Sequence, residues 1–412
     1  MAAIAMPVAC LIPKSRKSAF RNALGYYMAG LWPLIPGARR YLGHSDSTST
    51  AVLMWLCCST LLALPWTLAW TPTSRLNYLW RVPLANLAFV FPPLALIGFI
   101  TPISGAGYLF PGTGWFGLAV AAVLPGLALS LLGAIPSAAR TSASMGMAAV
   151  IAFSLATHMF AESCLRPPAG WEAVDTHFGN LSQSPQEFVA MEAVQQRVAR
   201  SSARVLIFPE SVVPRWSDAT AEFWRQTLVR CRARGQVLAI GAGLPLWVTN
   251  STNRRTDAEI VKQYDFAAAI EALNGADLRL PQALTTRGST DDSRADWYEN
   301  TLLFIGAYSS AFHQRIPIPV GMWRPLGSGG VPLHLSGPAV IELNSQRLAV
   351  LICYEQVLVY PVLASMLQRP TVLVGISNMY WFSSTAIPRY QASAMQAWAK
   401  LFGVPYLTAT NF

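Results

Sequence analysis

Four long apolar runs in the first 165 residues constrain the fold more than any other feature. Each is close to the roughly 20 residues that a helix needs to cross the hydrocarbon core of a bilayer. Over the whole chain, hydrophobic residues make up 53%, charged residues make up 12%, and the mean hydropathy is +0.36, all outside the soluble norm. The sequence therefore predicts an α-helical membrane domain over residues 1–165, with spans at residues 51–70, 83–101, 115–135 and 144–162.

A fifth apolar segment, residues 22–37, decides the expected topology. It is short and holds two prolines, so four or five spans stay open. With four spans and an inside N-terminus, Arg75, Arg81 and Arg140 would lie outside. With five spans they join the basic residues at 14–21 on the inside, as the positive-inside rule favours. We therefore expect a multi-pass protein of the bacterial inner membrane whose C-terminal domain is periplasmic.

The net charge of +10 comes mostly from arginines that are scattered along the chain. The sequence has no basic helix and no recognisable nucleic-acid motif, so we attribute the charge to topology and anionic lipid and expect no nucleic-acid partner. The six cysteines show no CxxC pair and no His/Cys ligand spacing, which argues against a zinc site or a disulfide framework. A bridge between Cys164 and Cys231 in an oxidising compartment stays open.

Beyond a Pro/Gly linker at residues 167–170, the composition is that of a soluble α/β domain, which we predict over residues 166–412. Strands and helices alternate without internal repeats, which favours a layered α/β fold. A polar stretch near residues 250–297 predicts an insertion. Strands are expected at residues 172–178, 204–208, 236–240, 299–307, 338–343, 347–353, 371–376 and 404–408, and helices at residues 185–200, 218–234, 355–367 and 388–402.

Two of these strands end in residues that can do chemistry. One apolar strand ends at Cys353, and another is followed by Pro209 and Glu210. A thiol is a weak nucleophile until a base takes its proton, so a carboxylate within hydrogen-bond reach would give this pair a function. Each residue of this pair also has an ordinary interpretation on its own. Buried cysteines are usually small core residues, and a Pro-Glu after a strand is usually a solvated turn.

Five short motifs follow one another along the second half of the chain. They are Phe-Pro-Glu-Ser (208–211), Glu-Asn-Thr-Leu (299–302), Ile-Cys-Tyr-Glu (352–355), Gly-Ile-Ser-Asn (375–378) and Ala-Thr-Asn (409–411). Their order resembles the carbon–nitrogen hydrolase (nitrilase) superfamily, and within it the apolipoprotein N-acyltransferase branch and its relatives in plasmid conjugal transfer. The resemblance covers residues 171–412 by motif and residues 1–165 by general plan. It implies a nitrilase-like αββα sandwich after the membrane helices.

The resemblance also implies roles for individual residues. Glu210 matches the general base and Cys353 the nucleophile, while the backbone N–H of Tyr354 would help to hold the oxyanion. Glu355 matches a supporting carboxylate. No metal or dissociable cofactor is implied. The expected substrate-pocket residues are Asn378, Trp381 and Trp323.

The lysine of the family's Glu-Lys-Cys triad is replaced in this chain. Counting back from Gly321 puts Gln314 at the lysine and Met322 at a glutamate of the same family segment. Gln314 can donate a hydrogen bond but brings no charge. Arg315 carries a charge but cannot give up a proton in the working pH range, so it is expected to act only as an electrostatic clamp.

Two hypotheses follow from these observations. In the first, the chain is a membrane-anchored thiol acyltransferase or amidase that uses phospholipid acyl chains and acts with lipoproteins or conjugation-machinery proteins. In the second, it is a catalytically inactive scaffold of the conjugation or envelope machinery. The missing lysine and glutamate favour the second hypothesis, and the retention of Glu210 and Cys353 favours the first. The oligomeric state stays open.

Overall fold

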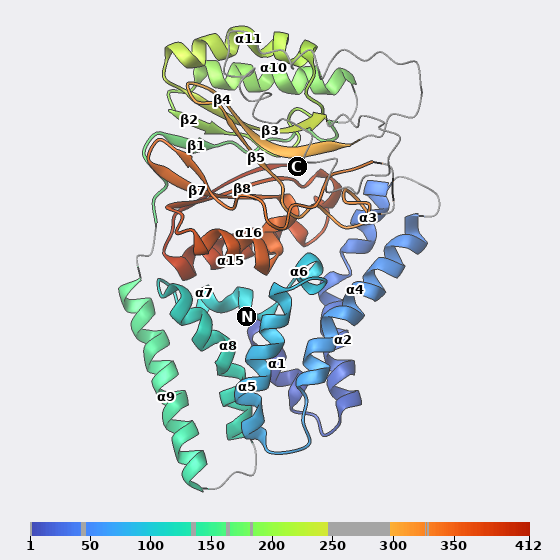
Figure 1. Ribbon diagram of the computed structural model, residues 1–412, viewed down its shortest axis with the longest axis vertical. Helices are drawn as coiled ribbons and strands as arrows, with labels where there is room; N and C mark the ends of the chain where they lie inside the picture. The colour runs from blue at the N-terminus through green and yellow to red at the C-terminus, as the bar shows by residue number, and fades with distance from the viewer. Residues whose placement is uncertain are drawn as a thin grey trace. The chain divides into compact units, whose positions relative to one another are not determined.

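The computed structural model describes residues 2–42, 47–132, 137–161, 165–181, 184–245, 297–325, 327 and 329–412 (Figure 1). Most of the expected insertion near 250–297 and the cysteine at 164 lie outside these residues, so both expectations about them stay open. The chain divides into two compact units. Unit 1 comprises Met1–Arg166, Gln356–Leu373 and Trp381–Tyr406, and unit 2 comprises Pro167–Glu355, Val374–Tyr380 and Leu407–Phe412.

Unit 1 is helical. Its first part contains α1 (Ala2–Leu11), α2 (Arg16–Leu31), α3 (Leu34–Leu42), α4 (Ser47–Ala69), α5 (Tyr78–Leu87), α6 (Leu94–Ile97), α7 (Ala106–Leu109), α8 (Gly114–Leu131) and α9 (Ser137–Phe160). The later segments add α15 (Val359–Leu367) and α16 (Ile387–Phe402), and α16 packs on α7, where Gly107 has no room for a side chain beside the Ala397 carbonyl.

Among the described residues, three helices are long and apolar enough to cross a membrane: Thr48–Ala69, Gly114–Leu131 and Arg140–Phe160. The expected span at 83–101 is wrong, because α5 ends at Leu87 and only short turns and α6 follow around the Pro92–Pro93 pair. Proline lacks the amide hydrogen that would continue the helical ladder. The segment at 22–37 is broken for the same reason, between α2 and α3.

The positive charge of the chain belongs to unit 1. This unit contains thirteen lysines and arginines and two carboxylates, a formal charge of +11, whereas unit 2 contains seventeen and eighteen, a charge of −1. The apolar helices and the basic side chains thus belong to the same compact unit, an arrangement suited to a membrane with anionic lipid.

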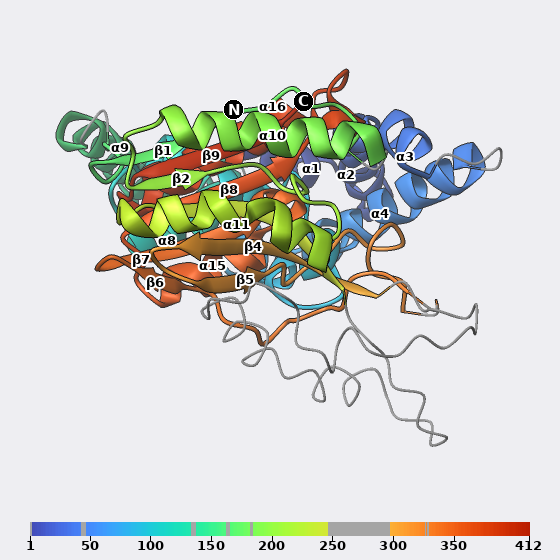
Figure 2. The same cartoon turned by 90° about the horizontal axis from the view of Figure 1, so that it is seen from above.

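Unit 2 is built on two sheets. The first has the order β1 (Trp171–Ala173), β2 (Val205–Ile207), β3 (Val237–Pro245), β4 (Tyr298–Gly306) and β5 (Ser310–His313). Its first three strands are parallel and its last three are antiparallel, so the sheet is mixed. Helices α10 (Ser184–Arg200) and α11 (Asp218–Ala233) lie side by side over one face (Figures 1 and 2), where Trp224 and Leu228 join a continuous apolar core.

The second sheet has the order β6 (Ile341–Leu343), β7 (Gln346–Ile352), β8 (Val372–Asn378) and β9 (Tyr406–Asn411). Strands β7 and β8 are almost wholly buried. The two sheets face each other (Figure 1), and residues that follow β5 and β2, Gln314 and Glu210, form hydrogen bonds with the ends of β7 and β8. The predicted helical N-terminal part followed by an α/β domain is confirmed, and the site described next lies where the two sheets meet.

Candidate active site

Cys353 lies at the end of β7, where the chain turns sharply into a 3-10 helix, Cys353–Val357. Its φ of +51° lies in the left-handed region, which L-residues other than glycine rarely adopt. Such strain costs on the order of 1–3 kcal/mol and tends to be retained at functional sites. The last five residues of β7, which lead into this turn, are all buried.

Glu210 follows β2 across the Phe208–Pro209 pair and is 3% exposed. Its Oε1 accepts a 2.6 Å hydrogen bond from the Asn300 side-chain amide, and its Oε2 accepts a 2.8 Å bond from the backbone N–H of Asn378. A side chain on Gly241 would come within 2.4 Å of the Glu210 Cα, so glycine on β3 is what allows this segment to approach. Two hydrogen bonds therefore hold the carboxylate, and the backbone that carries it lies against β3.

The structure brings Cys353 and Glu210 together: the thiol donates a hydrogen bond to the carboxylate, and the backbone N–H groups of Asn378 and Tyr354 donate to the sulfur. Burial raises the pKa of the Cys353 thiol, and the adjacent Glu210 charge raises it further. Burial also raises the pKa of Glu210, although its hydrogen bonds oppose this. The resting pair is thus a protonated thiol beside its base, not a preformed thiolate.

Gln314, at the position of the family lysine, is fully buried in a neutral network. Its Oε1 accepts a 2.9 Å hydrogen bond from the same Asn300 amide that holds Glu210, and its Nε2 donates to the Ile352 carbonyl at 3.1 Å. Asn300 therefore connects the glutamine to the base, and the glutamine holds the peptide group that precedes Cys353.

Arg315 and Glu355 form a buried ion pair with each other, with 3.2 Å between the Arg315 Nε and the Glu355 Oε1. Glu355 also accepts hydrogen bonds from the backbone N–H groups of Arg315, Ile316 and Ile352. The Arg315 guanidinium donates in addition to the Val350 carbonyl. This pair fastens the end of β7 to the segment after β5, so it positions Cys353 through the backbone.

The other expected pocket residues have separate places. Asn378 contributes its backbone N–H, and its side-chain oxygen accepts a 3.1 Å hydrogen bond from Asn411, which ties the fourth and fifth sequence motifs together. Trp323 ends a tight turn in which its N–H bonds to the Ile318 carbonyl. Trp381 belongs to unit 1, where its ring meets Tyr41 edge-on at 5.7 Å.

Sequence reasoning missed a second polar cluster beside this site. Glu299, next to Asn300 on β4, contacts His334 at 2.9 Å and His313 at 3.5 Å. Although burial opposes ionisation of Glu299, the two histidines lower its pKa to about 2, and the carboxylate raises the pKa of His334. The signal was the Glu-Asn-Thr-Leu motif, in which Glu299 and Asn300 point to opposite faces of the strand.

Within the described residues, no group of three or more His, Cys, Asp or Glu side chains is arranged to hold a metal ion. The groups that the site brings together are a thiol and a carboxylate, supported by neutral amides and backbone N–H groups.

No protein-family model matches the chain. Solved structures of an amidase from Nesterenkonia sp. resemble it weakly: one has a TM-score of 0.35 at 12% identity, covering 58% of this chain and 74% of that one. An active-site variant of this enzyme, described as an amidase from the nitrilase superfamily, has a TM-score of 0.36 at 11% identity, covering 60% and 79%. Similarity this low does not identify a shared activity.

Two curated proteins match over nearly the whole length. "Probable conjugal transfer protein TraB" of Sinorhizobium fredii is 28% identical over 420 residues, covering 99% of this chain and 92% of that protein. "Conjugal transfer protein TraB" of Agrobacterium fabrum is 28% identical over 436 residues, covering 99% and 88%. The expected resemblance to plasmid conjugal-transfer proteins is thereby confirmed. The chain is a homologue of the conjugal transfer proteins named TraB.

Proposed function

We propose that the chain is a membrane-anchored thiol acyltransferase or amidase of plasmid conjugal transfer, with Cys353 as nucleophile and Glu210 as base. The observation that carries this proposal is the buried hydrogen bond from the Cys353 thiol to the Glu210 carboxylate. Burying a carboxylate costs free energy. Glu210 is nevertheless buried, beside the thiol of Cys353, whose backbone is strained at the end of β7. In this position it can accept the thiol proton.

The reaction begins when an acyl ester or amide carbonyl meets the sulfur. Glu210 accepts the thiol proton as the Cys353 sulfur bonds to the carbonyl carbon, and the carbonyl oxygen becomes an oxyanion near the backbone N–H of Tyr354. When the tetrahedral intermediate collapses, the carbon–oxygen or carbon–nitrogen bond breaks and Glu210 returns its proton to the leaving group. An amine or water then attacks the thioester while Glu210 accepts its proton, and Glu210 returns that proton to the Cys353 sulfur as the carbon–sulfur bond breaks and the acylated product leaves.

The absence of a positive charge at position 314 determines the rate of acyl transfer that we expect. A lysine at position 314 would stabilise both the thiolate and the oxyanion with a charge, and losing one oxyanion donor elsewhere costs about 10²–10³-fold in rate. Gln314 and Asn300 supply only dipoles. We therefore expect slow acyl transfer, in which both the formation of the thioester and its release to an amine or water are slow.

Membrane anchoring is supported by the charge distribution and the three candidate spans. An odd number of spans puts the N-terminus and unit 2 on opposite sides of the membrane. With three spans, the basic residues at 14–40 and Arg140 lie inside, and of the basic residues that precede unit 2 only Arg75, Arg81 and Arg166 lie outside, which fits the positive-inside rule. We propose an inner-membrane protein with a periplasmic unit 2, phospholipid as acyl donor, and a lipoprotein or conjugation protein as acceptor.

An inactive scaffold is the second candidate, favoured by the raised pKa of the Cys353 thiol and by the engagement of Arg315 with Glu355. In this case the two sheets would be retained for assembly with other proteins of conjugation. Thiol reactivity separates the two candidates, because a scaffold has no need of an activated sulfur.

The test is competitive alkylation of the purified, detergent-solubilised full chain with limiting iodoacetamide near pH 7. Cys231 is the matched internal control, since it is also buried and burial likewise raises its pKa. We expect Cys353 to be labelled at least tenfold faster than Cys231, and Glu210→Gln to remove the difference. Mass spectrometry should also find an acyl group on Cys353 after incubation with phospholipid. Equal, slow labelling of both cysteines, with no acyl adduct, would refute the proposed activity.

A further inference from the structure

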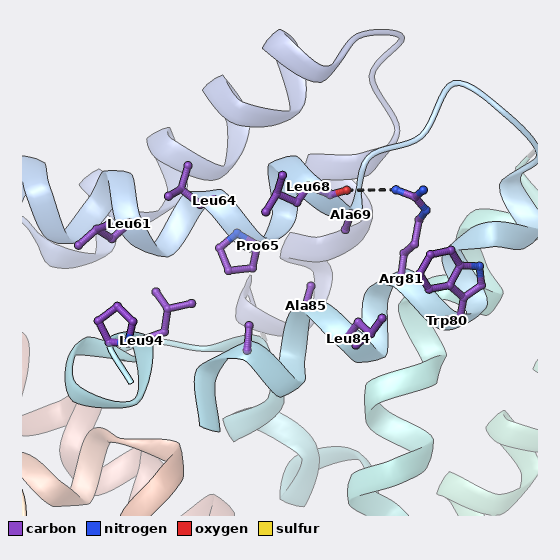
Figure 3. Close-up of a pocket in the computed structure, with 12 residues that line it drawn as sticks. Leu61, Leu64, Pro65, Leu68, Ala69, Trp80, Arg81, Leu84, Ala85 and Leu94 are labelled. Carbon is purple, nitrogen blue, oxygen red and sulfur yellow. Dashed lines mark hydrogen bonds between the residues drawn. The ribbon is translucent and has the colours of Figure 1, made fainter. Parts of the chain in front are cut away.

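An apolar groove runs along the outside of α4 in unit 1 (Figure 3). Its volume is about 450 Å³. One wall is α4, the other is α5, and Leu94 lies at one end, near Leu61. The lining residues are Leu61, Leu64, Pro65, Leu68, Ala69, Trp80, Arg81, Leu84, Ala85, Ala88, Pro93 and Leu94.

The walls of this groove are large apolar side chains that remain exposed. Leu64 is 42% exposed, Leu84 52% and Leu68 67%. Since α4 includes the candidate span Thr48–Ala69, such side chains are expected to face hydrocarbon, not water. From Leu61 to Leu68 the wall rises by roughly 10 Å along the helix, a length suited to part of an extended hydrocarbon chain.

Among the described residues, Arg81 is the only charged one that lines the groove, and it lies at the end where the candidate span stops. Figure 3 shows its guanidinium near Leu68 and beside Trp80: one nitrogen donates to the Leu68 carbonyl at 3.1 Å, and the group lies 4.8 Å from the indole centre. The bond to Leu68 satisfies one of the carbonyls that a helix leaves free at its C-terminus. The Arg81 Nε is buried and has no hydrogen-bond partner in the described part of the chain, so the guanidinium retains donor capacity.

No carboxylate is found among the described residues that line the groove. By sequence, the only acidic residues of unit 1 are Asp46 and Glu162. A guanidinium is matched by carboxylate and phosphate, with which it forms two parallel hydrogen bonds. An arginine and a tryptophan at the end of a membrane helix also lie at the depth of lipid headgroups.

We propose that this groove binds one anionic phospholipid, with an acyl chain between α4 and α5 and the headgroup phosphate on Arg81. The site contains none of the residues of the thiol site, and its ligand is structural or regulatory whether or not Cys353 is active. The apolar walls recognise the chain, and the single positive charge selects a lipid with net negative charge over a zwitterionic one.

The test uses the full chain, delipidated in detergent and titrated with phosphatidylglycerol or phosphatidylcholine, with bound lipid counted by native mass spectrometry. The wild-type chain should retain phosphatidylglycerol in preference to phosphatidylcholine. Arg81→Gln should weaken phosphatidylglycerol binding at least tenfold and remove the preference, since a hydrogen-bonded charge pair is lost. Leu84→Asp, at a half-exposed wall position, should weaken the binding of both lipids.

The matched control is Arg21→Gln, because Arg21 is also an arginine of unit 1 but donates to Ser18 at an exposed place. It should leave lipid binding unchanged, and all variants should keep the wild-type thermal transition. Phosphatidylglycerol binding that survives Arg81→Gln, or that falls equally with Arg21→Gln, would overturn the proposal. So would a lipid-free dimer that Leu84→Asp dissociates, because the groove would then be filled by a second copy of the chain.

Discussion

Replacing Gln314 by lysine tests whether the missing charge is what limits the thiol. Gln314 is fully buried and shares the Asn300 amide with Glu210, so a lysine there enters the same network. It can keep the donor bond to the Ile352 carbonyl but gives up the acceptor that Asn300 uses. The substitution therefore adds one charge at the cost of one neutral hydrogen bond.

The magnitude follows from the geometry of that bridge. The Asn300 nitrogen lies 2.6 Å from the Glu210 carboxylate and 2.9 Å from the Gln314 oxygen. An ammonium replacing the amide would thus be about 5 Å from the carboxylate, and at an effective dielectric constant of about 20 the two charges attract by roughly 3 kcal/mol. The free-energy cost of dehydrating the buried ammonium reduces this attraction. The pKa of the coupled Glu210–Cys353 pair should fall, because its first proton leaves more readily beside a cation.

The assay is the second-order rate of Cys353 alkylation in the solubilised chain, measured from pH 5 to pH 9. We expect Gln314→Lys to react about 10–100-fold faster than wild type near pH 7, since each 1.4 kcal/mol is roughly a factor of ten, and its pH profile should move to lower pH. Gln314→Met is the matched control, which removes the polar group without adding charge and should react no faster than wild type. If the lysine and methionine variants react at the same rate, charge at position 314 does not control the thiol and the electrostatic reasoning is refuted.

Three further predictions concern the surroundings of the site. Glu355→Gln leaves the Arg315 guanidinium buried without its counter-ion and should lower the free energy of unfolding by about 3–5 kcal/mol in denaturant titration, while the added change Arg315→Met should recover most of it. Because the folded-state pKa of His334 is raised, its contribution to stability is complete below its ordinary pKa and is lost as pH rises through the folded value. The wild type should therefore exceed His334→Gln in thermal stability more at pH 6 than at pH 9, and the reverse order would contradict the pairing with Glu299. Gly241→Ala should displace the backbone that carries the base and reduce selective thiol alkylation at least tenfold; unchanged selectivity would mean that the segment can shift without loss.

Buried strands were the part of the fold that the sequence predicted best. Runs of apolar residues predicted β7 and the region of β2, and the two chemical residues stand where those runs end. A strand that is buried on both faces consists almost entirely of apolar residues, so the ends of the apolar run predict where the strand begins and ends. β5 was missed because Ser310–His313 is short and half-exposed, and its residues resemble those of a loop.

The membrane helices show where composition is insufficient. Residues 83–101 are as apolar as a span, yet the chain there forms α5, a 3-10 turn and α6. Hydropathy measures which solvent a segment prefers, whereas a helix also depends on its amide hydrogens, and the adjacent Pro92 and Pro93 remove two in succession, where α4 and α8 each contain a single proline. The prolines were more informative about this segment than its mean hydropathy.

Side-chain partners across the site were not predictable, because they depend on which face of each strand turns inward. Arg315 was expected as a clamp near the thiol, but its guanidinium pairs with Glu355. Asn300 belonged to a recognised motif, and only the pairing of β4 with β3 and β5 shows that it joins Glu210 to Gln314. A shift of one residue in strand register would turn each side chain to the opposite face of the sheet and change its partners.

The state of the network at the replaced lysine bears on whether the site has decayed. A buried donor or acceptor left without a partner costs roughly 1–3 kcal/mol, so a site that loses its charges by drift should contain such groups. Unpartnered buried side-chain atoms occur elsewhere among the described residues, on Trp216 and Arg75 for example, but none is on Glu210, Asn300 or Gln314. The position of the second family charge is filled by Met322, which is buried and apolar. Because both family charges are absent together and the polar side chains of Glu210, Asn300 and Gln314 are all hydrogen-bonded, the network at the replaced lysine is complete without a cation, and neutral groups hold the protonated thiol and its base as a pair.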